Sequence, residues 1–273
     1  MMIVGVHGIR CYRYLAEAGT PERAAKVLAA EWALALNRPL SAAYYAQLLH
    51  PGDTQGADEP ETLPCDAQRM LKDWVSALGA PAEVTMGHAT IPVRQAADWI
   101  ARRFGEAARR FVIVFCREAH TYVSDRDSPR RAAAREEVLR VLEDAKPRVV
   151  VAHSLGSVVA YEALWHRPVE LDLLVTLGSP LGMPQVFFER LSLGAGNDER
   201  KGQRPPKVRR WVNIADVGDI VAIPRDLPRL FPGIDAHHEV SLGLTASHKA
   251  TRYLTRSEVE QELAPLLPAP DSQ

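Results

Sequence analysis

Apolar residues along the chain recur with two different spacings, which predicts strands interleaved with helices. Short runs dominated by valine, isoleucine and leucine, bounded by glycine, proline or polar residues, are typical of strands buried in a parallel sheet. One such run, at residues 149–153, passes through a tight turn into the helical pattern of residues 158–164. The predicted strands cover residues 2–6, 41–49, 149–153, 171–177, 208–214 and 239–242.

Longer segments carry apolar residues every three to four positions, the spacing of an amphipathic helix. The first of them begins with Thr20 as a capping residue and Pro21 at the first helical position. Residues 111–115 are compatible with a strand, but the wider pattern around them favours a helix. The predicted helices cover residues 20–36, 66–78, 94–115, 128–145, 158–164 and 246–253.

The order of these elements predicts an α/β protein with a mostly parallel sheet and helices on both faces. The length of 273 residues and a hydrophobic fraction of 47% suit one domain with a sizeable core. We expect that domain to cover residues 1–264, with the mostly helical residues 53–110 as an insert or cap. Residues 265–273 are rich in proline and are expected to form a flexible tail.

Charge and cysteine content narrow the functional classes. A formal net charge of −1 gives no bulk attraction to nucleic acid or an anionic membrane, so we expect neither as a partner. The arginine pairs at 102–103, 109–110 and 130–131 lie among Ala, Glu and Asp in helical sequence, which favours solvated helix faces over a phosphate site. No segment resembles a signal peptide or a membrane span, and the three cysteines lack paired spacing. These features predict a cytoplasmic protein.

The most informative motif is the turn Ala152-His-Ser154-Leu-Gly156, between a predicted strand and a predicted helix. A serine at such a junction, the nucleophile elbow, has a strained backbone that exposes its hydroxyl group. The turn also brings the helix close to the strand, so the positions two before and two after the serine must be small. Ala152 and Gly156 meet that requirement, and Ser154 is therefore the predicted nucleophile.

A catalytic serine needs a base, and the base needs a carboxylate to orient it. In parallel sheets such groups collect at the carboxyl ends of the strands, so the loops after the later strands are the places to search. Asp219 follows the predicted strand 208–214, and Gly218 permits a turn that would aim the carboxylate inward. Asp216 is the alternative acid, although it is more suited to capping the turn.

His248 is the predicted base, because it follows the last predicted strand at a junction between a loop and a helix. His237 and His238 precede that strand, at the wrong end for this topology, and His50 has no acid near it. The elbow geometry directs His153 away from the serine hydroxyl, which predicts a packing role. The order along the chain is then serine, aspartate, histidine.

Two backbone N–H groups are predicted to stabilise the oxyanion that forms on an attacked carbonyl. One belongs to Leu155, at the start of the helix after the serine. The other belongs to Ile9, in the loop after the first strand, where Gly8 lets the chain turn closely. No cluster has metal-ligand spacing, and no glycine-rich phosphate or dinucleotide motif occurs, so no metal or cofactor is expected.

With these residues the chain resembles the α/β-hydrolase superfamily, especially its lipase- and esterase-like members with Ala-His-Ser-Leu-Gly elbows. The resemblance implies Ser154, Asp219 and His248 as a catalytic triad. It also implies a compact variant that lacks the first two strands of the eight-stranded fold. The matching segments are residues 4–9, 149–163, 174–182, 213–221 and 247–248.

The expected activity is that of a serine hydrolase that cleaves an ester or thioester through an acyl-enzyme intermediate. A peptidase or amidase, or an acyl-transferring cyclase, is the alternative among enzymes. A non-catalytic binding module with a hydrolase fold is the alternative from another class, and the presence of all three triad residues argues against it. The expected partner is a small-molecule or acyl substrate, while the superfold hosts so many chemistries that the substrate and the oligomeric state stay open.

Overall fold

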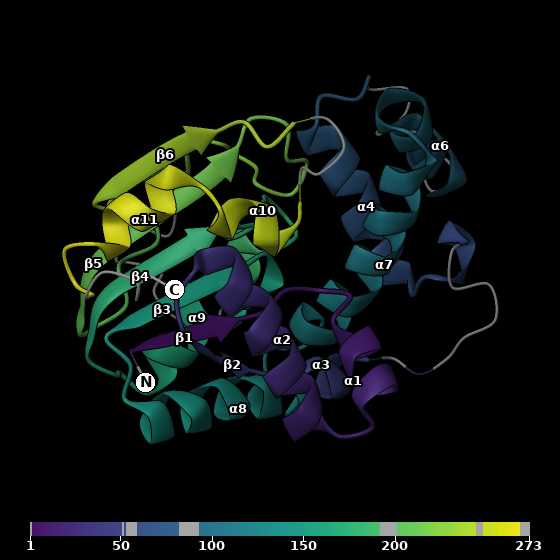
Figure 1. The fold of residues 1–273 in the computed structure, drawn as a ribbon. Coiled ribbons are helices and arrows are strands. Elements are labelled where there is room, and N and C mark those ends of the chain that lie inside the picture. Colours follow the sequence, from purple (N-terminus) through teal and green to yellow (C-terminus); the bar gives the residue numbers. More distant parts are fainter. Residues whose placement is uncertain are drawn as a thin grey trace.

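The computed structural model describes residues 2–50, 52, 59–81, 93–191, 201–243 and 248–267. Within these residues six strands form one sheet in the order β2-β1-β3-β4-β5-β6, and every neighbouring pair is parallel (Figure 1). The strands are β1 (Ile3–Val6), β2 (Ser41–Ala43), β3 (Val149–His153), β4 (Leu171–Leu177), β5 (Val208–Asp216) and β6 (Ala236–Val240). The chain is thus an α/β protein with an all-parallel sheet, as its sequence predicts.

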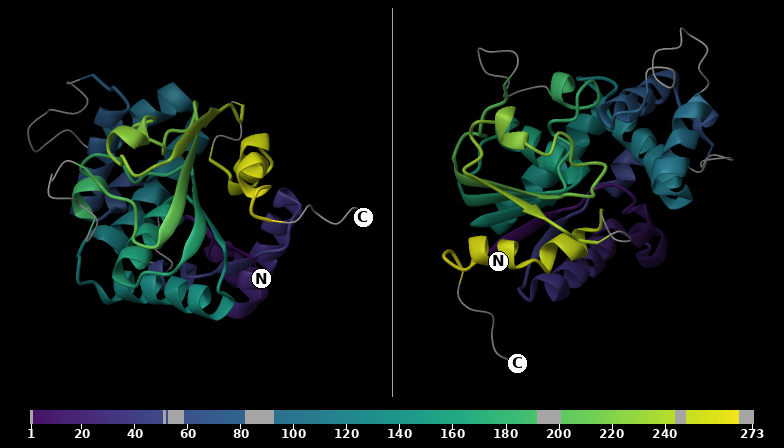
Figure 2. Two further views of the ribbon diagram at one scale, coloured as in Figure 1. Left: turned by 90° about the vertical axis from the view of Figure 1, so that its left-hand side faces the viewer. Right: turned by 90° about the horizontal axis from the view of Figure 1, so that it is seen from above.

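Helices connect the strands and lie on both sides of the sheet (Figure 2). The α-helices are α1 (Tyr12–Ala18), α2 (Pro21–Leu36), α3 (Ala46–Leu49), α4 (Cys65–Ala77), α6 (Val93–Phe104), α7 (Glu106–Val123), α8 (Pro129–Ala145), α9 (Leu155–His166), α10 (Ala250–Leu254) and α11 (Ser257–Leu263). Short 3₁₀ helices lie at Pro60–Thr62, Phe188–Arg190 and Leu227–Arg229. Across the ranges described above, none of the helices is both long and apolar enough to cross a membrane.

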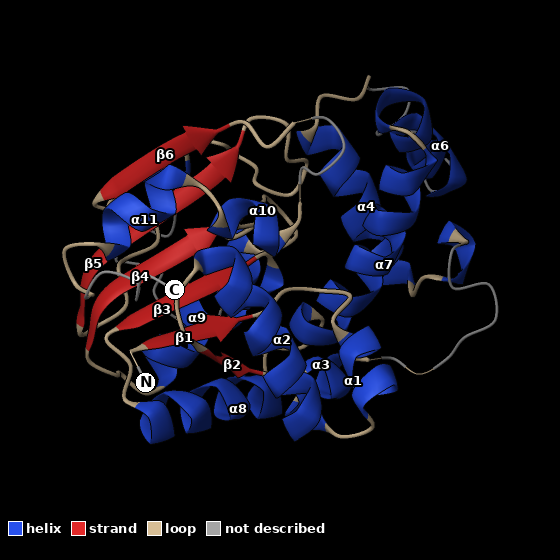
Figure 3. Cartoon of the chain, viewed as in Figure 1, coloured by secondary structure: helices blue, strands red, loops and turns tan. Residues whose placement is uncertain are grey.

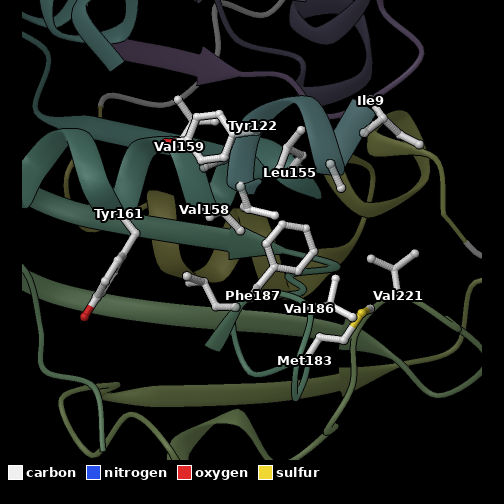
Figure 4. Close-up of a cluster of buried hydrophobic side chains, with 14 of the residues drawn as sticks. Ile9, Tyr122, Leu155, Val158, Val159, Tyr161, Met183, Val186, Phe187 and Val221 are labelled. Atoms are coloured by element: carbon white, nitrogen blue, oxygen red, sulfur yellow. The ribbon is translucent and has the colours of Figure 1, made fainter. Parts of the chain in front are cut away.

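The sheet separates two hydrophobic clusters, because alternate side chains of a strand point to opposite faces. On one face, Val4, Val150 and Leu174 pack with residues of α4, α6, α7, α8 and α9, and Figure 4 shows part of this first cluster. On the other face, Val149 and Val151 pack with residues of α1, α2, α10 and α11. Both faces of the sheet are therefore covered by helices, as expected for buried parallel strands.

All six strands point in one direction, so their carboxyl ends share one edge of the sheet. Helices α4, α6 and α7 stand beyond the arrowheads at that edge (Figure 3). They carry much of the predicted helical insert 53–110, but α7 continues past its predicted end to Val123. The insert therefore lies beside the edge at which loop residues of parallel sheets form binding sites.

The second predicted strand is shorter than expected. The strand predicted over 41–49 ends at Ala43, and residues Ala46–Leu49 form α3. Its partner β1 is itself short and ends at the same level, so the ladder cannot continue. The N–H of Tyr45 instead donates to Nε2 of His7 at 3.1 Å.

The last strand lies earlier than predicted, at Ala236–Val240 rather than 239–242. The prediction that His237 and His238 precede it is therefore wrong, because both lie within the strand. β6 is an edge strand with partly exposed side chains, so its polar composition resembles that of a loop. Nε2 of His238 lies 2.9 Å from Oε1 of Glu262 on α11, which identifies a structural contact.

The predicted helices are present, and two of them differ from their predicted bounds by more than three residues at one end. The helix predicted over 94–115 is divided into α6 and α7 by Gly105, which has a φ of 92° that interrupts helical geometry. Residues 111–115 are helical, as the wider pattern favours. The helix predicted over 246–253 begins at Ala250, and part of its predicted start lies outside the described residues.

One of the arginines that the sequence predicts on a solvated helix face is buried. Arg131 on α8 forms an ion pair with the equally buried Glu162 of α9, and the hydroxyl of Tyr122 donates to the same carboxylate at 2.7 Å. The sequence of α8 does not reveal this pairing, because the acidic partner belongs to another helix. Arg110 on α7 is exposed, as predicted.

A candidate catalytic site at the carboxyl ends of the strands

Ser154 occupies the turn between β3 and α9 with a φ of 56° and a ψ of −133°. This backbone conformation is rare for a residue with a side chain and costs about 1–3 kcal/mol. Its N–H donates to the carbonyl of Leu177 at 3.0 Å, and its carbonyl accepts from the N–H (2.9 Å) and the hydroxyl (2.6 Å) of Ser157. The hydroxyl of Ser157 also lies 2.7 Å from that of Ser179. These bonds hold the strained strand–turn–helix junction that the sequence predicts.

Close backbone packing surrounds this turn. A Cβ atom on Gly156 would lie 2.4 Å from the carbonyl oxygen of Val6, the last residue of β1, and 2.3 Å from that of His7, which follows it. A Cβ atom on Gly8 would lie 2.5 Å from Cβ and 3.0 Å from Oγ of Ser154. Ala152 is fully buried in the first cluster. Glycine is thus required at position 156 because the backbone of β1 packs against it. The close neighbour is β1, and not β3, the strand that precedes the helix α9.

Replacing Gly156 with alanine is expected to lower the free energy of unfolding by about 3 kcal/mol or more, because the added methyl group meets backbone that cannot rotate away. Chemical denaturation measures the change. Gly218→Ala is the matched control, since its Cβ would meet only Oδ2 of Asp216, at 3.3 Å, and we expect a loss below about 1 kcal/mol. Equal losses in the two variants would contradict the close approach at Gly156.

Three side chains from three loops form one hydrogen-bonded chain. Nε2 of His248 lies 2.7 Å from Oγ of Ser154, and Nδ1 lies 2.7 Å from Oδ2 of Asp219. Asp219 follows β5 and His248 follows β6, so both lie at the same edge of the sheet as Ser154. The side chain of Asp219 is 0% exposed and that of His248 is 8% exposed. The structure therefore brings together the predicted nucleophile, base and acid.

The carboxylate of Asp219 accepts three hydrogen bonds. Oδ2 accepts from His248 and from the hydroxyl of Tyr253, which lies at 2.7 Å, while Oδ1 accepts from the N–H of Val221 at 2.9 Å. Gly178 leaves room for this carboxylate, because a Cβ there would lie 2.8 Å from Oδ2. The three donors fix the orientation of the carboxylate toward the imidazole.

Asp216, the alternative acid, has a different role in the structure. Its Oδ1 accepts from the N–H of Leu242 at 2.8 Å, in the segment that leads to His248. Its Oδ2 is buried without a hydrogen-bond partner among the described residues. Asp216 therefore holds the loop that carries the histidine, and the imidazole itself is bound by Asp219.

Tyr253 belongs to the site although the sequence pattern does not single it out. Its hydroxyl donates to Oδ2 of Asp219 and accepts from the N–H of Asp216 at 2.9 Å. Burial and the charge of Asp219 raise the pKa of Tyr253 far above its usual value, so the hydroxyl keeps the proton that it donates. Tyr253 thus links Asp216, at the end of β5, and Asp219, in the loop after it, to α10.

Tyr253→Phe is expected to lower the free energy of unfolding by about 1–3 kcal/mol, because the buried N–H of Asp216 loses its acceptor. The turnover number should fall by roughly threefold to tenfold, since Asp219 loses one of the donors that orient it. Urea denaturation and turnover of a chromogenic ester measure the two effects. Tyr12→Phe is the control and should change neither quantity. The ring of Tyr12 stacks on that of His50, with the ring centroids 3.6 Å apart. Wild-type values for Tyr253→Phe would contradict the assignment.

His7 anchors the loop that runs past Ser154. Its Nδ1 donates to the carbonyl of Gly8 at 2.7 Å, and its Nε2 accepts from the N–H of Tyr45. The ring also stacks on that of Tyr45, with centroids 4.2 Å apart. A trans peptide directs its C=O and N–H to opposite sides, so this anchor turns the N–H of Ile9 away from the His7 ring.

The two predicted oxyanion donors are both available. The N–H of Leu155 is the first of α9, where helix geometry provides no acceptor. Neither this group nor the N–H of Ile9 donates to an acceptor within the described part of the chain. The side chains of Ile9 and Leu155 are buried in the first hydrophobic cluster (Figure 4), which restrains the backbone at both positions.

Acid is expected to destabilise the fold through the histidines of this region. Burial lowers the pKa of His7 from 6.5 to about 4 and that of His153 well below its usual range. The unfolded chain then binds more protons than the native one below pH 6.5, so the free energy of unfolding falls as the pH is lowered from 6.5 to 4. His7 alone contributes about 3 kcal/mol over this window. Glu118, whose pKa burial raises to about 7, has the opposite effect and offsets most of the His7 contribution, so the net fall comes mainly from His153.

Urea denaturation at a series of pH values measures this dependence. His7→Gln removes one titrating group, so its dependence on pH should be flatter than that of the wild type. The same slope in both proteins would show that His7 does not contribute to the dependence.

Two aromatic rings pack against the imidazole of His248. The ring of His153 has its centroid 4.7 Å away, and that of Phe111 lies edge-on at 5.2 Å. The packing role expected for His153 therefore includes contact with the base. Because Phe111 belongs to α7, the helices beyond the strand ends reach the site directly.

Comparison with known proteins leaves the family open. A scan of the sequence against protein-family models, a search of curated proteins and a search of solved structures each gave no match. The fold and the geometry therefore stand by themselves: an α/β protein with a six-stranded parallel sheet, whose carboxyl edge brings Ser154, His248 and Asp219 into one hydrogen-bonded chain.

Proposed function

We propose that this protein is a serine hydrolase that cleaves an ester-type bond, in an ester or a thioester, through an acyl-enzyme intermediate. The observation that carries the proposal is the chain from Asp219 through His248 to Ser154, with 2.7 Å on each side of the imidazole. A serine hydroxyl bonded to an imidazole, whose other nitrogen is held by a buried carboxylate, is the arrangement that activates serine for acyl transfer.

In the proposed reaction, Nε2 of His248 takes the proton from Oγ of Ser154 as that oxygen attacks the substrate carbonyl. The carboxylate of Asp219 holds the proton on Nδ1 and stabilises the imidazolium that forms. His248 then gives its Nε2 proton to the departing alcohol or thiol. A water molecule, deprotonated by the same nitrogen, finally releases the acid from Ser154 and restores the hydroxyl.

The N–H groups of Leu155 and Ile9 stabilise the negative oxygen of the tetrahedral intermediate in this scheme. Both are available donors on restrained backbone, which supports the assignment. His7 acts on the second donor indirectly, through its hydrogen bond to the carbonyl of Gly8. It is a positioning residue, because it has no contact with the reacting atoms in the scheme.

We also propose a compact α/β-hydrolase fold. The support is the nucleophile after β3, the acid after β5 and the base after β6, on a parallel sheet of six strands in place of eight. The helices α4, α6 and α7 would be its cap, since Phe111 of α7 touches the base. The free thiols of Cys11, Cys65 and Cys116 fit the proposed cytoplasmic location.

Labelling with a fluorophosphonate probe tests the proposal. Mass spectrometry should find one adduct, on Ser154 of the wild type, and no adduct on Ser154→Ala or on His248→Gln within the same time. Ser76→Ala, which removes an exposed serine of α4, is the control and should be labelled like the wild type. A folded wild-type protein that gains no adduct, or gains it on Ser179, would overturn the scheme.

A further inference from the structure

A small cavity opens between the loop after β1 and one side of α7. Its volume is about 280 Å³, and it is lined by Arg10, Ala107, Arg110 and Val114. The three residues of α7 are spaced by three and four positions, so they share one stripe of the helix. Two arginines from separate segments therefore line one cavity. The pattern of charges along the sequence does not reveal this arrangement.

Each wall of this cavity is next in the chain to residues that contact the proposed catalytic side chains. Arg10 follows Ile9 directly, and a Cβ on Gly8 of the same loop would lie 3.0 Å from Oγ of Ser154. On the other wall, Phe111 follows Arg110 directly and contacts the ring of His248. The cavity is therefore a candidate site for the other end of a substrate whose carbonyl lies at Ser154.

Neither guanidinium lies within ion-pair distance of a carboxylate in the described part of the chain, although the charges of Arg10 and Glu118 act on each other. Both side chains are exposed, and neither forms an ion pair or a side-chain hydrogen bond with the described residues. The adjacent Arg109, by contrast, lies 3.7 Å from Glu59 and 4.0 Å from Asp98. Two unpaired cations beside a cavity form a region of positive potential that favours an anionic ligand.

The position of Arg10 is itself held under strain. Its φ is 62°, in the left-handed region that residues with side chains rarely adopt. Its N–H donates to both carboxylate oxygens of Glu118 on α7, each at 3.1 Å. Burial raises the pKa of Glu118 to about 7, which reduces its negative charge near neutral pH. Strain of this kind persists where the surrounding structure enforces it, often at ligand sites.

We propose that the substrate is a short acyl ester that carries a second, anionic group, a carboxylate or a phosphate, which Arg10 and Arg110 bind. The inference rests on the proposed hydrolase function and adds its substrate class. Guanidinium groups bind carboxylates and phosphates through paired N–H donors. Ala107 and Val114 provide the apolar wall for the short chain between the anion and the scissile carbonyl.

Two p-nitrophenyl esters of similar length test the proposal, the neutral butyrate and the anionic monosuccinate. We expect kcat/KM for the monosuccinate to exceed that for the butyrate by about tenfold or more, because one charge-assisted contact is worth about that factor. The ratio should fall toward one in Arg10→Gln/Arg110→Gln and at high salt, which screens exposed charges. Arg103→Gln on α6, outside the cavity, is the control and should keep the wild-type ratio.

The outcomes separate the two proposals. Turnover of both esters with a ratio near one, or a ratio unchanged in the double variant, would overturn the anionic substrate and leave the hydrolase standing. If neither ester is turned over, binding of glutarate and of phenyl phosphate to Ser154→Ala decides the matter by calorimetry. Binding to Ser154→Ala that is lost when both arginines are also replaced supports the anion site. The stronger of the two ligands then shows whether the site prefers a carboxylate or a phosphate. Absence of binding overturns the anion site. Absence of a fluorophosphonate adduct would instead remove the hydrolase scheme.

Discussion

Ser154→Ala is expected to lower the turnover number of ester hydrolysis by roughly 10⁴-fold or more, to the level that the oxyanion donors and substrate binding alone provide. The reason is the loss of Oγ, the only atom of the hydrogen-bonded chain that can form the acyl-enzyme. Steady-state kinetics with a chromogenic ester measure the loss. A residual activity within tenfold of the wild type would show that another residue is the nucleophile.

A second variant at the same position separates chemistry from folding. Ser154→Gly should be as inactive as Ser154→Ala, yet more stable than it by about 1 kcal/mol, because only glycine releases the strain at a φ of 56°. The gain is smaller than the strain itself, since glycine loses more backbone entropy on folding. Chemical denaturation compares the two. If the glycine variant were the less stable, the strained turn would not be the relevant feature.

Asp219→Asn is expected to lower the turnover number by about 10³- to 10⁴-fold, with the fold retained. An amide presents either an oxygen or an NH₂ group to Nδ1 of His248, and with the NH₂ group there the imidazole takes the wrong tautomer. The side-chain NH₂ also faces the hydroxyl of Tyr253, which donates to this position in the wild type. Kinetics together with circular dichroism distinguish the catalytic loss from unfolding.

Asp216→Asn is the matched control for this variant, because Asp216 at the end of β5 lies only three positions before Asp219 and both are buried. Its remaining carbonyl can still accept from the N–H of Leu242, so we expect a fall in turnover of less than about tenfold. A larger loss for Asp216→Asn than for Asp219→Asn would make Asp216 the acid. Equal losses would mean that the loop, and not one carboxylate, limits the reaction.

The parts of the site that follow from local sequence are those with short-range causes. The elbow is readable because β-branched residues, a small–His–Ser–Leu–Gly turn and a helical pattern are contiguous between Val149 and Leu164. Asp219 is distinguishable from Asp216 because Gly218 provides a turn between them. His248 is identifiable because parallel topology directs the search to the loop after the last strand.

Other parts depend on contacts between distant segments and carry no local signal. The hydroxyl of Tyr253 meets Asp219 only because α10 packs beside β5, and an aromatic residue in a helix is most often simply core. The pairing of Arg131 with Glu162 requires knowledge of which helices are neighbours. Edge strands are a third case, because β6 is half-exposed and its two histidines give it the composition of a loop.

The parallel order of the strands has a consequence for how activity is acquired. Val6 of β1 pairs with Ala152 of β3 across the whole helical insert, and Ser154 and His248 are separated by 94 positions in the chain. Contacts between such distant segments form late, because the chain must lose the entropy of closing the intervening loops before these contacts stabilise it. Refolding of the denatured protein should therefore pass through collapsed states with formed helices and no functional centre. Activity would return in one cooperative step, when the first strand, the elbow and the histidine loop have all docked.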